Sequence, residues 1–181
     1  MHCKGKDDEM DTEPSARAVA DRQAIIDQIH RYARSVDRLD EDVGYAVWHE
    51  DGTADYGEDI YQGSGRGFID FCLASHRKAL MHSHQMTNTI IDLDGDRASS
   101  ETYAIVVVRS KSKVNEGKIA HYMAWSRYLD TWSCRDGRWA IDHRYAVVDF
   151  DVATEVDPSM KAWRGARDRN DPSYHILRSA K

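Results

Sequence analysis

Apolar positions in the first third of the chain follow the period of an α-helix. Pro14 suits the first turn of a helix, and the segment after it carries a single apolar stripe. The stripe consists of Ile25, Ile26, Ile29, Ala33 and Val36. We therefore predict a long helix from Pro14 to about Asp37, a short helix over residues 41–49 and a third helix over residues 66–80.

From residue 81 onward the pattern changes to the two-residue alternation of β-strands. Residues 94–96 and 135–138 have the composition of hairpin turns, and residues 115–117 link the two pairs of strands. Short strands are also predicted near residues 54–56 and 60–62. Helices followed by a long antiparallel meander indicate an α+β fold, in which a curved sheet carries helices over one face.

The length of 181 residues is typical of one domain with tails. We expect residues 1–13 to form a disordered leader, residues 14–156 the folded domain and residues 157–181 a C-terminal extension. The extension is rich in Arg, Asp and Ser but also contains Trp163 and Tyr174. We therefore expect it either to pack on the body or on a partner subunit, or to be disordered.

Charge and hydropathy exclude several classes of protein. Lys and Arg number 25 against 31 Asp and Glu, and this net charge of -6 argues against general nucleic-acid binding. No apolar run approaches the roughly 18 residues of a membrane helix, and the N-terminal residues lack the apolar segment of a secretory signal. The three cysteines form neither a metal motif nor a disulfide framework, which favours a reducing cytoplasm. Without a glycine-rich nucleotide motif, no nucleotide cofactor is expected.

Two polar residues border the apolar stripe of the first helix. At about 100° per residue, Asp37 and Tyr32 fall on either side of the stripe and therefore border whatever it covers. A carboxylate in the last turn also opposes the helix dipole, a violation that sometimes marks a site. The alternative is that Asp37 or Asp40 caps the next short helix.

His82 and His84 lie on one face of the first long strand, because they are two residues apart. Three interpretations are open at this point. In the first, the pair binds a metal, although no carboxylate follows closely as a cupin-like site would require. In the second, one histidine is a general base and the other is structural. In the third, both are surface or interface residues.

Further polar and aromatic residues are candidates for lining a pocket. Those inside otherwise apolar strands are Tyr103, Arg109, His121, Trp125, Arg127 and His143. The earlier aromatic candidates are Tyr45, Trp48 and Tyr56. Their facing depends on strand register and bulges. Arg127 and Asp130 alternatively form a cross-strand ion pair without catalytic meaning.

Four segments in this order resemble the SnoaL-like branch of the nuclear-transport-factor-like superfamily. They are IHRYARSVDRLD, HSHQMTNTIIDLDGDRA, SRYLDTW and CRDGRWAIDHR, and with their spacing they span roughly residues 17–150. The resemblance implies a cone-shaped curved antiparallel sheet, with three N-terminal helices covering its concave face and a deep pocket between the layers.

The resemblance also implies a chemistry. The members most similar in these motifs are cofactor-free lyases, namely scytalone dehydratase, bile-acid dehydratase and hexachlorocyclohexane dehydrochlorinase, in which a first-helix aspartate partners a strand histidine. Asp37 and His84 match those positions, and Tyr32 matches a tyrosine that bile-acid dehydratase keeps. A diarylpropane lyase, ketosteroid isomerases and the small subunits of ring-hydroxylating dioxygenases share the fold.

These implications lead to one expectation with alternatives. We expect a cofactor-independent, metal-free lyase that eliminates water from an aromatic or polycyclic hydrophobic small molecule, with no nucleic acid or membrane as partner. The alternatives are a retro-aldol lyase that releases formaldehyde from an aromatic diol, an isomerase, and a non-catalytic subunit or binding module. We expect Tyr45, Trp48, Tyr56, Tyr103, His121, Trp125 and Arg127 to contact the substrate. A homo-oligomer, dimer or trimer, is expected to form through sheet segments 105–108 and 125–132.

Overall fold

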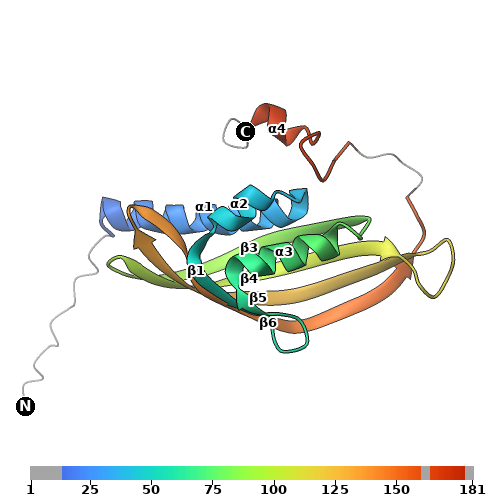
Figure 1. Cartoon of the computed structure of the whole chain (residues 1–181), viewed down its shortest axis with the longest axis horizontal. Helices are drawn as coiled ribbons and strands as arrows, with labels where there is room; N and C mark the ends of the chain where they lie inside the picture. The colour runs from blue at the N-terminus through green and yellow to red at the C-terminus, as the bar shows by residue number, and fades with distance from the viewer. Residues whose placement is uncertain (1–13, 160–163, 178–181) are drawn as a thin grey trace, which may run out of the picture.

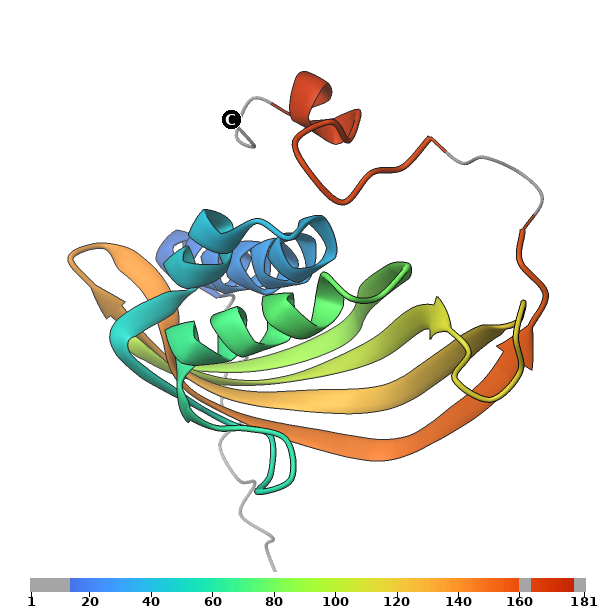
Figure 2. The same ribbon diagram turned by 45° about the vertical axis from the view of Figure 1, so that its right-hand side comes forward.

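The computed structural model of the chain describes residues 14–159 and 164–177 and has an α+β architecture. In chain order the elements are α1 (Ala16–Arg38), α2 (Glu41–Ala46), β1 (Trp48–Asp55), β2 (Gln62–Ser64), α3 (Gly65–His76), β3 (Met81–Asp94), β4 (Arg97–Lys111), β5 (Ile119–Arg135), β6 (Arg138–Val156) and α4 (Ser173–Ile176). The sheet is strongly curved, and α1 and α3 lie over its concave face (Figure 1, Figure 2).

The six strands form one open sheet in the order β2-β1-β6-β5-β4-β3. Strands β3 to β6 are the predicted antiparallel meander, with turns at both predicted hairpins. One prediction was wrong: the sheet is mixed rather than antiparallel, because β1 runs parallel to β6. After the N-terminal helices, β1 joins the sheet beside β6, the last strand of the meander, and runs in the same direction. The other side of β1 pairs with β2, which forms the edge of the sheet.

Capping explains where α1 begins and ends and where α2 begins. The Oγ of Ser15 accepts a hydrogen bond from the backbone N–H of Ala18 at 3.1 Å, which starts α1. Leu39, with a left-handed φ of 54°, ends it. Asp40 is the N-cap of α2 and accepts from the N–H of Val43. Since Asp40 fills that role, Asp37 is not needed as a cap.

The second helix is shorter than predicted, and this corrects the sequence interpretation of residues 41–49. It ends at Ala46, and Trp48 and His49 begin β1 instead. Trp48 is fully buried and lies where α3 approaches the strand closely. A Cβ atom on Gly65 would lie 2.1 Å from the Trp48 ring, so only glycine fits at the start of α3.

The core lies between the helices and the concave face of the sheet. From α1 it receives Ile25, Ile29 and Val36 of the predicted stripe, all at most 1% exposed. Tyr32, predicted at the border of the stripe, is also 1% exposed, whereas Ile26 is only partly buried. From α3 it receives mainly Phe68, Ile69 and Leu73. The apolar layer holds α1 and α3 against the strands and fixes the positions of the polar residues at its margin.

Part of the C-terminal extension packs on the helical layer, on the side away from the sheet (Figure 2). The hydroxyl of Tyr174 donates to Asp40 at 2.8 Å, and Arg34 donates to Ser173 at 3.0 Å. Residues 164–177 therefore follow the packed alternative, whereas the predicted leader, residues 1–13, lies outside the described residues. None of the helices described is long and apolar enough to cross a membrane.

Candidate active site

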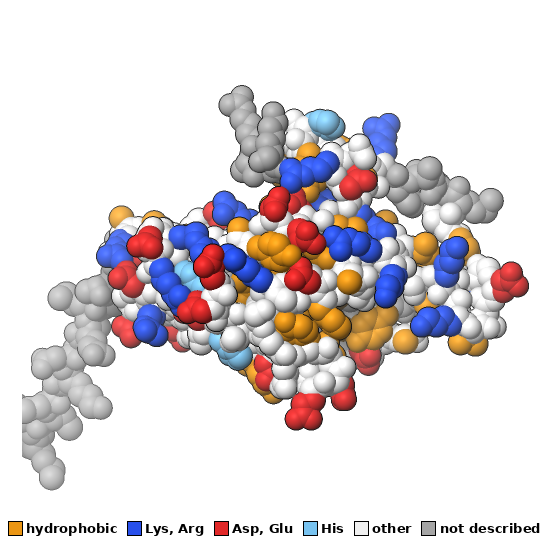
Figure 3. Space-filling view, viewed as in Figure 1, with side chains coloured by type: hydrophobic (Ala, Val, Ile, Leu, Met, Phe, Trp, Pro, Cys, Tyr) orange, Lys and Arg blue, Asp and Glu red, His pale blue; other side chains and the backbone are white. Residues whose placement is uncertain are grey.

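A cavity of about 200 Å³ lies between α3, the second half of α1 and the concave face of β4, β5 and β6. Its wall is mostly aromatic and aliphatic. It consists of Tyr32, Tyr56, Ile60, Phe68, Phe71, Cys72, Ser75, His76, His84, Val106, Tyr122, Ala124, Ser126, Tyr128, Ala146, Val147 and Val148. Figure 3 shows hydrophobic side chains gathered on this side of the molecule, among charged side chains. The cavity is open to solvent on one side, and its mostly apolar wall is of the kind that small molecules occupy.

Asp37 and His84 meet at the edge of this cavity. The Nδ1 atom of His84 lies 2.8 Å from Oδ1 of Asp37. The backbone N–H of His84 donates to both oxygens of the same carboxylate, at 3.1 and 3.0 Å. The carboxylate of α1 is therefore held by three contacts to one residue of β3, which fixes both the strand and the imidazole ring.

This geometry determines which nitrogen of His84 is reactive. Since the Asp37 carboxylate accepts, Nδ1 carries the hydrogen and Nε2 carries a lone pair in the neutral ring. The side chain of Asp37 is 16% exposed and that of His84 is 5% exposed, so little water competes for their contact. The arrangement can accept a proton at Nε2 and stabilise the resulting imidazolium through Asp37.

Three tyrosines surround the deep end of the cavity. The hydroxyls of Tyr32 and Tyr56 lie 3.1 Å apart, and the ring of Tyr32 meets those of Tyr128 and His84 edge-on, at 5.7 and 6.4 Å. Burial raises the pKa of Tyr56 to about 12 and holds the pKa values of Tyr32 and Tyr128 above their usual range. All three are therefore neutral hydrogen-bond donors at neutral pH.

A buried arginine lies behind the tyrosines. Arg144 of β6 is 0% exposed and forms a two-pronged ion pair with Asp130 of β5, at 2.7 and 2.8 Å. Its guanidinium carbon lies 4.2 Å from the ring centre of Tyr32 and 4.3 Å from that of Tyr128. It also donates to the hydroxyl of Tyr56 at 3.5 Å. Burial works to lower the pKa of Arg144, but Asp130 outweighs it and raises that pKa well above the ordinary value.

Two further histidines lie beside the Asp37–His84 pair. His82 is 4% exposed, and its Nε2 lies 2.6 Å from the carbonyl oxygen of Val36. Arg167 lies 3.4 Å from its Nδ1, so both ring nitrogens have partners. The imidazole of His76 is 4.1 Å from that of His82, and burial lowers the pKa of His76 to about 3. Both nitrogens of His82 are thus engaged within the protein, and His82 and His84 are not arranged as a two-ligand set.

The cavity contains one thiol. Cys72 of α3 is 7% exposed, and its Sγ lies 3.7 Å from the imidazole nitrogens of His76. Burial raises the pKa of this thiol to about 12, so it is present as the neutral thiol. Cys72 therefore contributes shape to the wall rather than a nucleophile.

The structure separates the residues that sequence reasoning assigned to the pocket. Tyr32, Tyr56 and His84 line the cavity, with Asp37 directly behind His84. Two others lie elsewhere. Trp48 is in the core beneath Arg144, and the hydroxyl of Tyr45 bonds to Asp70 at the surface.

Four of the assigned residues lie on the other face of the sheet, which corrects their placement in the pocket. They are Tyr103, His121, Trp125 and Arg127. The cavity uses the even-numbered positions of β5, from Tyr122 to Tyr128, so the odd-numbered positions face outward. There Trp125 stacks on Phe150, and His121 accepts from Arg109 at 2.9 Å. This outer face carries the segments expected to join subunits, and the oligomer stays a prediction.

The sequence interpretation also missed part of the site. Tyr128, His76, Cys72 and the Arg144–Asp130 pair were not assigned to it. Asp130 was considered as a partner of Arg127, but Arg127 pairs with Glu101 and Asp149 instead. The two-residue alternation of β5 could have indicated two of them, because Tyr128 and Asp130 lie on the same face of the strand as the other even-numbered residues of the cavity wall.

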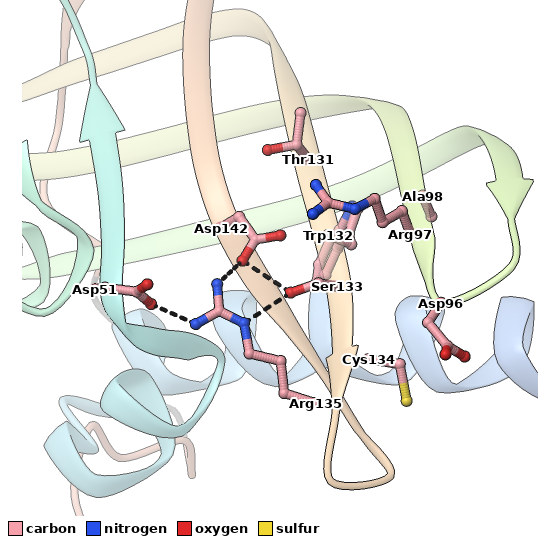
Figure 4. Close-up of a pocket in the computed structure, with 10 residues that line it drawn as sticks. All are labelled: Asp51, Asp96, Arg97, Ala98, Thr131, Trp132, Ser133, Cys134, Arg135 and Asp142. Atoms are coloured by element: carbon pink, nitrogen blue, oxygen red, sulfur yellow. Dashed lines mark hydrogen bonds and ion pairs between the residues drawn. The ribbon is translucent and has the colours of Figure 1, made fainter.

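A second, larger hollow of about 730 Å³ lies at the β5–β6 turn (Figure 4). There Arg135 reaches Asp51 at 2.8 Å and also contacts Asp142 and Ser133 (Figure 4). The side chain of Arg135 is 46% exposed, and its charge is already paired with two carboxylates. Since exposed ion pairs of this kind occur widely at surfaces, we place the candidate active site at the Asp37–His84 cavity.

Comparison with solved structures supports the fold alone, because the sequence identities are low. A protein from Novosphingobium aromaticivorans that is provisionally named a scytalone dehydratase has a TM-score of 0.65 and 18% identity, over 80% of this chain and 97% of that one. Hexachlorocyclohexane dehydrochlorinase LinA-type3 from Novosphingobium barchaimii has a TM-score of 0.63 and 16% identity, over 80% and 95%. ActVI-ORFA from Streptomyces coelicolor has a TM-score of 0.56 and 17% identity, over 72% and 98%.

Family membership rests on the sequence. No curated protein sequence matches the chain significantly. The sequence model of the SnoaL-like domain, in contrast, matches residues 17–145, which include all but the first residue of α1, the whole of β3 and the first part of β6 with Arg144. The chain therefore belongs to the SnoaL-like family, within the superfamily of cone-shaped folds related to nuclear transport factor.

Proposed function

We propose that the protein is a cofactor-independent lyase in which His84 is the general base and Asp37 orients it. The observation that carries this proposal is the 2.8 Å contact between Nδ1 of His84 and Asp37 at the wall of an aromatic cavity. This contact directs the basic Nε2 of His84 away from the carboxylate. General base catalysis of this kind contributes roughly 10²–10⁴-fold to a rate.

The reaction we favour is the elimination of water. Nε2 of His84 takes a proton from carbon, the electrons of that C–H bond form the C=C bond, and the C–O bond to the hydroxyl group breaks. The leaving oxygen takes a proton from a neutral donor and departs as water. Tyr56 is suited to donate because its hydroxyl already accepts from Arg144, which leaves its own hydrogen for Tyr32 or for an oxygen of the substrate. The imidazolium of His84 then returns the proton to the tyrosine.

The wall of the cavity indicates the class of substrate. Phe68 stacks on Tyr56 with ring centres 3.8 Å apart, and Phe71 extends the same aromatic surface outward. Flat, ring-bearing hydrophobic molecules fit such a wall. A volume of about 200 Å³ lies below the roughly 300–1,000 Å³ of common ligand pockets. We therefore favour hydroxylated compounds with one or two rings over tetracyclic ones.

The test is the mass of the product. The purified protein is incubated, without added metal or nucleotide, with hydroxylated one-ring, two-ring and tetracyclic compounds and with diarylpropane diols. Loss of water identifies a dehydratase. Loss of formaldehyde identifies a retro-aldol lyase that uses the same base on a hydroxyl hydrogen, and an unchanged mass with a shifted spectrum identifies an isomerase.

Three variants connect the reaction to the site. Asp37→Asn and His84→Ala are expected to lower kcat by about 10²–10⁴-fold. His121→Ala is the matched control, because His121 is also a strand histidine with a polar partner but lies on the outer face. Folded Asp37→Asn and His84→Ala proteins that turn over at the parental rate would refute the assigned roles. Binding without turnover by the parent protein would favour a non-catalytic binding module.

A further inference from the structure

The segment of residues 164–177 lies beyond the stretch that matches the family, yet one of its side chains reaches the candidate active site. Arg167 is half-buried and donates two hydrogen bonds from Nη1. One goes to the carbonyl oxygen of His76 at 2.7 Å, where α3 ends. The other goes to Nδ1 of His82 at 3.4 Å, near the start of β3.

These contacts fix the protonation of His82. A guanidinium group only donates, so Nδ1 of His82 must carry the lone pair. The carbonyl oxygen of Val36 only accepts, so Nε2 of His82 carries the hydrogen, across a distance of 2.6 Å. His82 is thus held as one neutral tautomer between a residue of the C-terminal segment and the last turns of α1.

The position of His82 connects this tautomer to His84. Val36 directly precedes Asp37, and His82 lies two residues before His84 on the same face of β3. The hydrogen bond from His82 to Val36 therefore runs beside the contacts between His84 and Asp37 and joins the same turn of α1 to the same strand.

A second proton on His82 would act directly on the candidate base. The imidazole of His82 is 4.1 Å from that of His76 and 6.3 Å from that of His84, between ring centres. A positive charge on His82 would oppose the formation of the imidazolium of His84, and Asp37 is the carboxylate in contact with His84 that would partly offset it. Burial already opposes this second proton, and the positive charge of Arg167, which faces Nδ1, opposes it further.

On these grounds we propose that Arg167 is a positioning residue: it holds His82 as the neutral Nε2–H tautomer, so that His84 is the only proton acceptor of the site. This inference rests on the proposed function for its effect on turnover, but not for its effect on His82. The C-terminal segment thereby stabilises the site through His76 and His82. It does not cover the cavity, whose wall contains no residue of 164–177.

The direct test is the protonation of the His82 ring, followed by ¹⁵N NMR of the full chain from pH 5 to 8. The parent is expected to show unprotonated Nδ1 and protonated Nε2 throughout this range. In Arg167→Ala we expect the pKa of His82 to rise measurably, and Arg167→Lys to restore part of the parental behaviour. Arg164→Ala, which removes an equal charge from an exposed position of the same segment, should match the parent.

Two observations keep the test independent of folding and of the reaction. The backbone signals of Ser173 and Tyr174 report whether the segment stays docked through their contacts with Arg34 and Asp40. A docked Arg167→Ala protein whose His82 titrates as in the parent would overturn the proposal, and so would a parent with hydrogen on Nδ1. Neither result depends on a substrate. The role of Arg167 can therefore be refuted while the role of His84 stands, and the role of His84 can be refuted while that of Arg167 stands.

Where turnover is measurable, the pH profile completes the test. We expect Arg167→Ala to lose up to about tenfold in kcat toward pH 5 and much less near pH 8, because a rise of one pKa unit lowers the neutral fraction of His82 by at most tenfold, and only where the pH lies near or below that pKa. A loss that is equal at every pH would show a purely structural role and would overturn the proposal.

Discussion

Each face of the sheet carries an arginine paired with carboxylates, but the two arginines have opposite surroundings. On the concave face, Arg144 and its partner Asp130 have side chains that are 1% and 0% exposed. On the outer face, Arg127 joins Glu101 and Asp149, and its side chain is 28% exposed. Asp130 and Arg127 are only three residues apart on β5. Their different surroundings follow from the alternation of side chains along one strand.

The comparison shows that the effect of a charged residue on a site depends on whether the surrounding structure excludes water. The helices cover Arg144, so its charge acts at short range on the hydroxyl of Tyr56 and the rings of Tyr32 and Tyr128. Solvent screens Arg127, and its ion pairs belong to the polar surface. Both groups consist of an arginine with carboxylates, and burial is what distinguishes the Arg144–Asp130 pair as part of the candidate active site.

Breaking the buried pair is the largest effect that we predict. Asp130→Ala should lower the free energy of unfolding by about 3–5 kcal/mol, because it leaves the charge of Arg144 buried without a partner. Asp149→Ala, on the outer face, should leave the urea unfolding curve close to that of the parent. Urea denaturation followed by tryptophan fluorescence measures both.

A double variant separates the cost of an unpaired charge from the value of the pair. Asp130→Leu combined with Arg144→Met removes both charges, and should recover much of the stability lost in Asp130→Ala. Equal losses in Asp130→Ala and Asp149→Ala would show that burial does not distinguish the two pairs.

The buried histidine His76 predicts a dependence of stability on pH. Its pKa is lowered from 6.5 to about 3, so below pH 6.5 the unfolded chain binds a proton that the native protein does not. Stability is therefore complete above pH 6.5 and falls toward pH 3, with a slope of up to about 1.4 kcal/mol per pH unit. Burial also lowers the pKa of His82, which adds a loss of the same sign.

Replacement of His76 sharpens the contrast between the faces. His76→Gln should flatten the decline in stability between pH 6.5 and 4, whereas His121→Gln, on the outer face, serves as the matched variant. Urea midpoints across this pH range give the slope. An identical decline in the parent and in His76→Gln would contradict the assignment of the proton to His76.

Much of the fold could be predicted because turns and period act locally. The turn after β5 pairs Arg135 with Arg138, and this turn alone fixes the register of the hairpin at its closed end. Period alone placed Asp37 at the border of the apolar stripe and put His82 and His84 on one strand face. The pairing of Asp37 with His84 was predicted from the resemblance to SnoaL-like lyases.

The rest was not predictable because bulges change register without a signal in the sequence. Continued from the turn, an unbroken ladder would pair Asp130 with His143. A shift between Thr131 and Trp132 pairs it with Arg144 instead. The parallel pairing of β1 with β6 is equally invisible, because it joins strands about ninety residues apart in sequence. The partners that complete the site thus depend on tertiary contacts.

The smallest effect concerns single hydroxyl groups on the two faces. Tyr56→Phe removes a hydroxyl that is linked to Tyr32 and Arg144, whereas Tyr103→Phe removes one from a side chain that is 39% exposed on the outer face. Because the neutral hydroxyl of Tyr32 lies 3.1 Å away and can donate the proton instead, Tyr56→Phe removes the contribution of one neutral hydrogen bond, about 0.5–1.5 kcal/mol. It should therefore lower kcat roughly 2- to 13-fold, and Tyr103→Phe should not change it. If Tyr56→Phe lowers kcat while KM stays constant, the hydroxyl acts in the transition state. If only KM rises, Tyr56 binds substrate, and the donor to the leaving oxygen must be sought at Tyr32.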